Sequence, residues 1–274
     1  MAAKKALCVG INQFHNYPSS ALQGCVNDAR DMASICKDVL HFSDQEITIL
    51  TDEKATKASI MKQLRAMVDE AIAGKVGHMV FSMSSHGTQV PDVSGDEPDR
   101  ADEAFCPHDL AEANGQWDPQ HVITDDELNG LFVKLPQSVL LEVFLDTCHS
   151  GTGLKALDLL PGRKPRFLPP PTPMALAQVE NKRYHGLARY LLEHGVTHHI
   201  LWAACRADQT SADAHIGGGW HGAFTYFFSR EIREHPASSR KELLTKVRVA
   251  LREGHYSQTP QLEVNATNRK ARLG

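Results

Sequence analysis

The strongest constraint on the fold is the regular alternation of short apolar runs with segments of helical periodicity. The apolar runs have the length and composition of buried strands, and they cover Lys5–Ile11, Glu46–Leu50, Gly77–Met83 and Val139–Leu145. Apolar residues at helical spacing predict intervening helices at Asn27–Leu40, Thr56–Ala73 and Asp125–Leu135. Strands that alternate with helices indicate crossover connections between parallel strands. The sequence therefore predicts an α/β fold with a mostly parallel central sheet and helices on both faces.

A proline-rich segment divides the chain. Six of the 14 prolines lie between Pro161 and Pro173, where they exclude a helix interior and a central strand. After it, the pattern predicts a helix at 184–194, a strand at 198–203, helices at 223–235 and 240–252, and a strand near 261–264. We expect residues 1–154 and 181–274 to form one domain, joined by an exposed proline-rich loop at 155–180.

The composition excludes several classes of protein. Lys and Arg number 29 against 33 Asp and Glu, so the basic excess that phosphate-backbone binding uses is absent. No apolar run approaches the roughly 18 to 20 residues of a membrane span, and the N-terminus lacks the apolar core of a signal peptide. The 6 cysteines show no CxxC or CxxH spacing, which favours reduced thiols over disulfides or zinc. We expect a cytoplasmic protein with neither nucleic acid nor membrane as a partner.

Two predicted strands end in residues suited to nucleophilic chemistry. His86 follows the strand at 77–83, and Cys148 follows the strand at 139–145. Ligands of open parallel sheets bind beyond the carboxyl ends of the strands, so both side chains are expected at one site. An imidazole can take the proton of a thiol and then protonate a leaving amine. Alone, each residue fits a packing role equally well. His149 is the less favoured candidate for the base, because its side chain should diverge from that of the neighbouring Cys148.

Six segments carry a resemblance to a known family. They are GCVNDARDM, SSHGTQVPDVSGDEPDRADE, ITDDEL, FLDTCHSGTG, ILWAACRADQ and HGAFTYFF. In order and spacing they resemble the caspase-like peptidases, specifically the metacaspases and orthocaspases, from Lys5 to Val264. The resemblance implies a caspase-hemoglobinase fold, with a large-subunit region before the proline-rich loop and a small-subunit region after it. It also implies a catalytic dyad of His86 and Cys148, with the backbone N–H groups of Gly87 and Cys148 as the oxyanion hole.

The resemblance further implies a first specificity pocket lined by Asp28, Ser84 and Asp146. Two carboxylates in a semi-enclosed pocket attract a guanidinium or ammonium group and repel an aspartate. We therefore expect protein substrates that are cut after Arg or Lys, with a bidentate match favouring Arg. Asp28 opens a predicted helix, so a helix cap is its alternative role.

Clustered acidic residues raise the question of calcium. The run Asp92–Glu103 and the pair Asp125 and Asp126 offer the carboxylate oxygens that hard cations prefer. In metacaspases that need calcium, the resemblance implies a site from one aspartate of the run, taken here as Asp102, from the Asp-Asp pair, and from an aspartate seven residues after the nucleophile. That last position is Lys155, which weakens the site. We expect no required cofactor and keep calcium as an option, with a solvated acidic loop as its alternative.

Together these observations predict a monomeric cysteine endopeptidase that acts on protein substrates. Basic residues in the proline-rich loop predict a zymogen activated by a cut at Lys155, Arg163, Lys164 or Arg166, made by the chain itself or by an upstream peptidase. The resemblance suggests a stress or defence cascade as the setting. The alternatives are a catalytically weak caspase-like scaffold, a peptidase switched by calcium without processing, and a cysteine hydrolase of non-peptide substrates.

Overall fold

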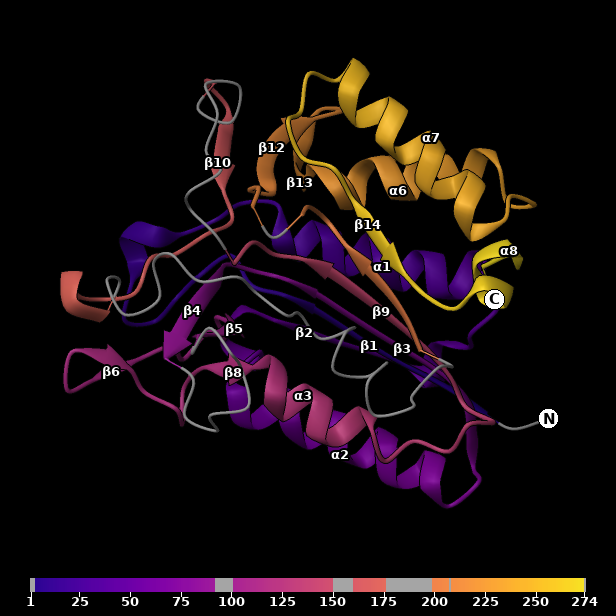
Figure 1. Cartoon of the computed structure of the whole chain (residues 1–274), viewed down its shortest axis with the longest axis horizontal. Coiled ribbons are helices and arrows are strands. Elements are labelled where there is room, and N and C mark those ends of the chain that lie inside the picture. The colour runs from indigo at the N-terminus through magenta and orange to yellow at the C-terminus, as the bar shows by residue number, and fades with distance from the viewer. Residues whose placement is uncertain (1–2, 92–100, 150–159, 176–198, 207, 274) are drawn as a thin grey trace.

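A six-stranded sheet forms the centre of the molecule (Figure 1). The computed structural model describes residues 3–91, 101–149, 160–175, 199–206 and 208–273. The strand order is β14-β11-β9-β3-β1-β2, with β1 at Ala3–Gly10, β2 at Ile47–Thr51, β3 at Val76–Ser84, β9 at Leu140–Asp146, β11 at His199–Ala203 and β14 at Gln261–Glu263. Only β14 runs antiparallel to its neighbour in this sheet, which confirms the mostly parallel arrangement. Strands from both sides of the proline-rich segment share the sheet.

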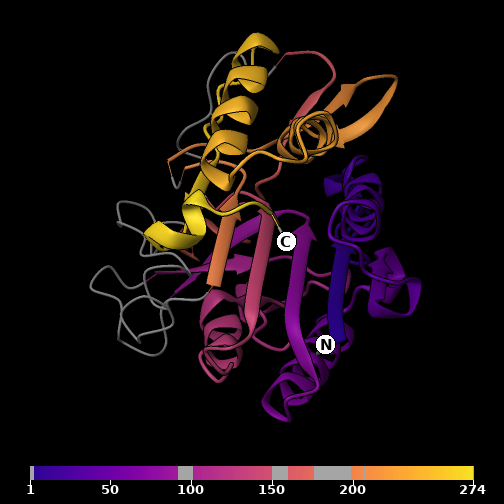
Figure 2. The ribbon, with the colours of Figure 1, turned by 90° about the vertical axis from the view of Figure 1, so that its right-hand side faces the viewer.

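Helices cover both faces of this sheet (Figures 1 and 2). The described helices are α1 at Cys25–Asp38, α2 at Lys57–Ile72, α3 at Asp125–Phe132, α6 at Ala223–Glu234, α7 at Arg240–Glu253 and α8 at Ala266–Lys270. On one face lie α2 and α3, and on the other lie α1, α6 and α7. Each helix longer than α8 matches a predicted one. The predicted helix at 184–194 falls outside the described residues.

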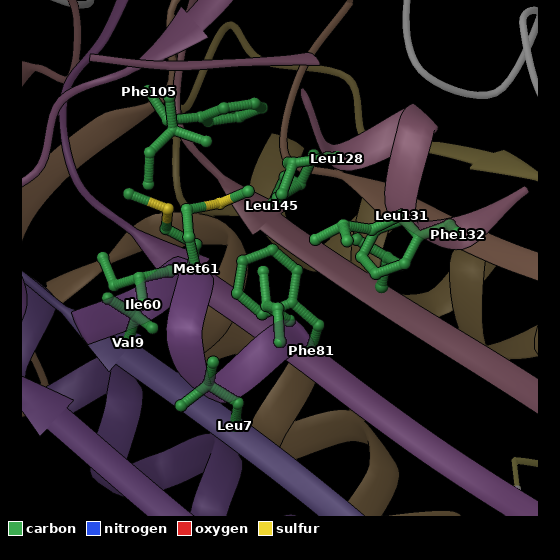
Figure 3. Close-up of a cluster of buried hydrophobic side chains, with 14 of the residues drawn as sticks. Leu7, Val9, Ile60, Met61, Phe81, Phe105, Leu128, Leu131, Phe132 and Leu145 are labelled. Atoms are coloured by element: carbon green, nitrogen blue, oxygen red, sulfur yellow. The ribbon is translucent and has the colours of Figure 1, made fainter. Parts of the chain in front are cut away.

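The strands supply two separate cores because successive side chains point to opposite faces. In β1, Leu7 and Val9 pack with Phe81 and the α2 residue Ile60 on one face (Figure 3). Cys8 belongs to the core on the other face. Full burial of one such apolar side chain contributes about 1.5 to 3 kcal/mol, so the two cores fix the sheet and the positions of its strand ends.

Short strands that the sequence analysis did not predict frame the carboxyl edge of the sheet. They are β4 at Gly87–Pro91, β5 at Ala101–Phe105, β6 at Glu112–Ala113, β7 at Gln116–Trp117, β8 at Ile123–Thr124, β10 at Arg163–Pro165, β12 at Ala212–Ile216 and β13 at Gly219–Gly222. They form three small sheets, ordered β4-β5-β8, β6-β7 and β10-β12-β13. These sheets surround the strand ends at which a site is expected.

The proline-rich segment differs from the expected exposed loop. Its residues 163–165 form β10, an edge strand that pairs antiparallel with β12. An edge strand tolerates Pro165 because one side of the strand needs no ladder hydrogen bonds. The next residue, Arg166, is fully buried, because carboxylates surround its guanidinium group. No described helix is both long and apolar enough to cross a membrane.

Candidate active site

The carboxyl ends of β3 and β9 bring His86 and Cys148 to the same edge of the sheet. The two strands are neighbours, with Ser84 opposite Asp146, and each candidate residue follows two positions later. Their backbones approach so closely that a Cβ atom on Gly87 would lie 2.1 Å from the carbonyl oxygen of Cys148. Only glycine fits at this position, which explains why it follows His86.

A backbone carbonyl orients the imidazole of His86. Its Nε2 lies 2.8 Å from the carbonyl oxygen of Ser20, so Nε2 carries a proton and Nδ1 is the nitrogen that can accept one. The ring is 5% exposed and packs against Phe14. Burial lowers the pKa of His86 to about 4, so the imidazole is neutral at pH 7 and can act as a base. Sequence reasoning missed Ser20 because a backbone carbonyl has no side-chain signature.

The thiol of Cys148 is buried beside a second thiol. Its Sγ donates a hydrogen bond to the carbonyl oxygen of Gln209 at 2.8 Å. The Sγ of Cys205 lies 3.4 Å from the same oxygen. A hydrogen bond with Cys148, together with burial, raises the pKa of Cys205 well above its ordinary value. Because a thiolate has no proton to donate, Cys148 must leave the Gln209 carbonyl when it becomes a nucleophile.

An arginine of the chain itself occupies the predicted specificity pocket. Nη2 of Arg166 donates to Asp28 at 2.6 Å and to Asp213 at 2.8 Å. Its Nη1 lies 3.3 Å from a carboxylate oxygen of Asp146 and donates to the Asp146 carbonyl at 3.1 Å. All four side chains are at most 2% exposed. The pocket therefore surrounds one guanidinium group with three carboxylates.

Hydrogen bonds from several elements hold these carboxylates in place. One oxygen of Asp28 accepts from the N–H of Gly222. The two oxygens of Asp146 accept from the hydroxyls of Ser211 and Thr225. Burial and the nearby Asp146 nevertheless raise the pKa of Asp28 to about 7, although the guanidinium group opposes this rise. The pocket is thus preorganised to bind a cation.

The third carboxylate, on Asp213, was not predicted. It lies on β12 and accepts hydrogen bonds from the N–H groups of Gln23 and Gly24. The N-cap of α1 is Gly24, so Asp28 lies inside the helix and does not cap it. Ser84, which was predicted to line the pocket with the aspartates, is buried at the end of β3. Its neighbours in the sheet are Gly10 of β1 and Asp146 of β9. Asp213 was missed because β12 is held by its pairing with β10 and β13 and was itself not predicted.

The backbone around Arg166 is held like an added strand. Its carbonyl oxygen accepts from the N–H of Gly87 at 2.9 Å, and its N–H donates to the carbonyl oxygen of Ser211 at 2.9 Å. The N–H of Leu168 donates to the carbonyl oxygen of Gly87 at 2.9 Å, and Phe167 bridges Gly87. Hydrogen bonds of this kind fix an extended peptide in a groove. The predicted oxyanion donor Gly87 therefore binds the carbonyl group of an arginine.

Contacts with four other residues hold the imidazole of His149. Its Nδ1 lies 3.4 Å from the carbonyl oxygen of Thr88 and its Nε2 lies 3.3 Å from the hydroxyl of Thr147. The ring packs edge-on against Phe105, with 4.8 Å between ring centres, and faces Glu103 at 3.8 Å. These contacts leave His86 as the candidate base.

The candidate calcium ligands lie at a different corner. Asp102 is on β5, which pairs with β8, and β8 leads directly into Asp125 and Asp126 at the start of α3. Asp102 and Asp126 line a cavity of about 460 Å³ with Trp117. Lys155 lies outside the described residues. Among the residues that the structure describes, groups of three ligand atoms within 4.8 Å of one another occur elsewhere, at Asp28, Asp31 and His221 and at Glu231, Glu234 and His235. Calcium binding stays a prediction from the sequence.

Comparison with known proteins identifies the family. The model of the metacaspase, peptidase C14 domain matches residues 4–158. Metacaspase-1 of Scheffersomyces stipitis is 31% identical over 94% of this chain and 70% of its own length. Metacaspase-1 of Cryptococcus neoformans is 30% identical over 96% of this chain, which spans 62% of that relative.

Solved structures show the same fold. A protein of Geobacter sulfurreducens matches 98% of this chain and 97% of its own, with a TM-score of 0.69 and 25% identity. Caspase-1 of Spodoptera frugiperda matches with a TM-score of 0.58 at 13% identity, over 96% of this chain and 86% of its own. With the strand ends and the close backbone approach already described, these similarities confirm the caspase-like fold. The chain belongs to the metacaspases, a family of caspase-like cysteine peptidases.

Proposed function

We propose that this chain is a cysteine endopeptidase that cuts proteins after Arg or Lys and is made as a zymogen that holds its own cleavage site. The observation that carries the proposal is the pose of Arg166. Its guanidinium group lies among three aspartates, and its carbonyl oxygen accepts a hydrogen bond from Gly87. A substrate arginine would need the same two contacts, one for its side chain and one for the carbonyl that is attacked.

The chemistry follows from the two strand ends. Nδ1 of neutral His86 takes the proton of the Cys148 thiol, and Sγ attacks the carbonyl carbon of the substrate arginine. The N–H groups of Gly87 and Cys148 stabilise the negative charge that develops on the carbonyl oxygen. His86 then gives its proton to the leaving amine. Water cleaves the thioester and regenerates the thiol.

The pocket favours Arg over Lys. One Nη atom of Arg166 bonds two carboxylates, and the other faces a third carboxylate and a carbonyl oxygen. A planar guanidinium group can satisfy acceptors on two sides, whereas an ammonium group is a single point of charge. An aspartate side chain would meet three like charges. We expect Arg to be preferred, Lys to be accepted and Asp to be rejected.

Among the four candidate activation residues, the contacts support Arg166. Lys164 is exposed, and its Nζ donates to the carbonyl oxygen of Ala21 at 3.1 Å. This contact does not involve the aspartates of the acidic pocket. Arg163 binds the carbonyl groups of the turn that follows α7. Lys155 is outside the described residues. A cut between Arg166 and Phe167, by the chain's own thiol or an upstream peptidase, would free the groove.

The proposal includes the setting in which the peptidase acts. We expect the peptidase to act as a monomer on protein substrates in a cytoplasmic stress or defence cascade, in line with its family. A calcium switch without processing is the second candidate, and the acidic residues at one cavity favour it.

The test uses the full chain, the Cys148→Ala variant and an Arg166→Ala variant, each incubated with and without calcium. We expect mass spectrometry to find a new N-terminus at Phe167 in the wild type but not in Cys148→Ala or Arg166→Ala. The Lys164→Ala variant is the matched control and should still be cut at this bond. We also expect Cys148→Ala to lose cleavage of Arg-ended reporter peptides by roughly 10³-fold or more. A wild type that prefers Asp-ended peptides would contradict the proposal. So would an Arg166→Ala variant that stays uncut and yet cleaves reporter peptides as fast as the wild type.

A further inference from the structure

Strand β10 presents a second arginine to a separate surface. We infer that the enzyme has an additional basic subsite, selective for arginine at the fourth residue before the cut, formed by the ring of Tyr256 and the carbonyl groups of Gly254 and His255. This inference rests on the proposed function, because it takes Arg166 as the residue before the cut. Arg163 is then the fourth residue, and it shows how a substrate arginine would bind.

The contacts of Arg163 define the subsite. Nη1 donates to the carbonyl oxygen of His255 at 2.7 Å, and Nη2 donates to that of Gly254 at 3.1 Å. The guanidinium carbon lies 3.9 Å from the centre of the Tyr256 ring. Two carbonyl acceptors in the plane and an aromatic face against the plane match the shape of a guanidinium group. A lysine ammonium group would match this arrangement less well.

The subsite is built by the end of a helix and does not depend on Arg163. Helix α7 ends at Glu253, and His255 takes the left-handed conformation, with φ of 59°, that closes the helix. The N–H of Tyr256 bonds back to the carbonyl oxygen of Leu251. The carbonyl groups of Gly254 and His255, which accept from Arg163, lie at the negative end of the helix dipole, where a cation is favoured.

The Tyr256 ring is also fixed in advance. It packs edge-on against Phe227 of α6, with 5.9 Å between ring centres. Burial raises the pKa of the phenol more than the nearby Arg163 lowers it, so the phenol is neutral at pH 7. The attraction therefore comes from the ring face, and a phenylalanine in place of Tyr256 should preserve it.

The position of Lys164 and Pro165 in β10 explains why these two residues contribute less to recognition than the arginines do. Arg163 pairs with Ala214 and Lys164 with Asp213 in the antiparallel ladder with β12. Lys164 is exposed, with its Nζ near one carbonyl group, and Pro165 is only partly buried. Recognition of the segment is therefore concentrated on its first and last arginines, which bind two different surfaces.

The test compares reporter peptides that differ only at the fourth position before the cut: Arg-Lys-Pro-Arg, Lys-Lys-Pro-Arg and Ala-Lys-Pro-Arg. The enzyme is the self-cleaved full chain as wild type, Tyr256→Ala and Tyr256→Phe. We expect kcat/KM to be about tenfold higher for the Arg peptide than for the Ala peptide in the wild type. Tyr256→Phe should keep this ratio, and Tyr256→Ala should reduce it to near one. Equal rates for the Arg and Ala peptides in the wild type would overturn the subsite.

A binding measurement separates this inference from the proposed function. In the Arg163→Ala, Arg166→Ala double variant of the full chain, both of the chain's own arginines are removed. Fluorescence polarisation with labelled Arg-Lys-Pro-Arg and Ala-Lys-Pro-Arg then requires no catalysis. We expect about tenfold tighter binding of the Arg peptide, a preference that Tyr256→Ala removes. Equal affinity would overturn the subsite even if the enzyme proved active, and tighter binding without any cleavage would count against the proposed function only.

Discussion

At the scale of single residues, the acidic pocket is an unusual use of buried charge. Three carboxylates and one guanidinium group lie together at no more than 2% exposure. Burial of charges is costly, and their attraction offsets the cost only when every partner is present. If substrates bind through a cation, as proposed, apolar residues could not replace these aspartates. Arg166, the residue after β10, compensates the pocket in this structure. In the proposed function a substrate arginine or lysine would take its place.

This compensation predicts a large effect of Arg166→Ala on stability. Removal of one partner from a buried ion pair leaves uncompensated charge, so we expect a loss of about 3 to 5 kcal/mol in the free energy of unfolding. The measurement is urea denaturation at pH 7.5 in the Cys148→Ala background, which prevents self-cleavage. Lys164→Ala is the control and should change stability by less than about 1 kcal/mol. A similar small change for Arg166→Ala would show that the cluster does not stabilise the fold.

The pKa values in the site predict the dependence of the reaction on pH. The pKa of Asp28 is raised to about 7, mainly by burial, and that of His86 is lowered to about 4, mainly by burial. Below pH 7, Asp28 binds a proton and attracts the substrate guanidinium less, whereas His86 stays neutral down to about pH 4. The value for Asp28 holds with Arg166 in the pocket, and Arg166 lowers it, so Asp28 titrates higher once the pocket is open to substrate. We expect kcat/KM on an Arg-ended peptide to rise with pH at and above about 7. Asp28→Asn should lower kcat/KM and remove this rise with pH. The same rise in the variant would show that it does not come from Asp28.

At the scale of elements, sequence reasoning succeeded where structure is decided locally. The periodicity of β1 and α2 is visible within each segment, so their bounds were predicted to within a few residues. The strand β10, of sequence Arg-Lys-Pro, has no apolar pattern and exists because it pairs with β12. The same long-range pairing delivers Asp213 to the pocket. The candidate dyad and two of the three aspartates came from motifs, whereas Ser20 acts through a backbone carbonyl that no motif records.

The contact between two strand ends predicts a strict requirement for glycine at position 87. A Cβ atom there would lie 2.1 Å from the carbonyl oxygen of Cys148 and 2.9 Å from Nδ1 of His149. The backbones would have to separate, and the N–H of Gly87, the proposed oxyanion donor, would move with them. We expect Gly87→Ala to lower kcat/KM on an Arg-ended peptide by about 10²-fold or more. Gly130→Ala in α3 is the matched control, since a Cβ atom there meets nothing within 4 Å, and activity equal to that control would refute the argument.

At the scale of the whole molecule, the site depends on both sides of the proline-rich segment. Asp28 on α1 and Asp146 on β9 precede it, and Asp213 on β12 follows it. The central sheet is shared in the same way, because β11 pairs with β9. A cut after Arg166 would therefore break the chain into two fragments but leave its hydrophobic core undivided.

This shared sheet predicts that the two fragments stay together after a cut between Arg166 and Phe167. Five residue pairs join β9 to β11, and Trp202 of β11 stacks on Phe144 of β9, with 6.0 Å between ring centres. The contacts are buried and apolar, so they hold without the covalent link. We expect the cut chain to run as two bands under denaturing electrophoresis and to elute in native size exclusion at the volume of uncut Cys148→Ala. Because association would replace the link, the midpoint of unfolding in urea should rise with protein concentration for the cut chain and stay constant for the uncut control. Two separate native peaks would show that the strands of the central sheet cannot hold the molecule together.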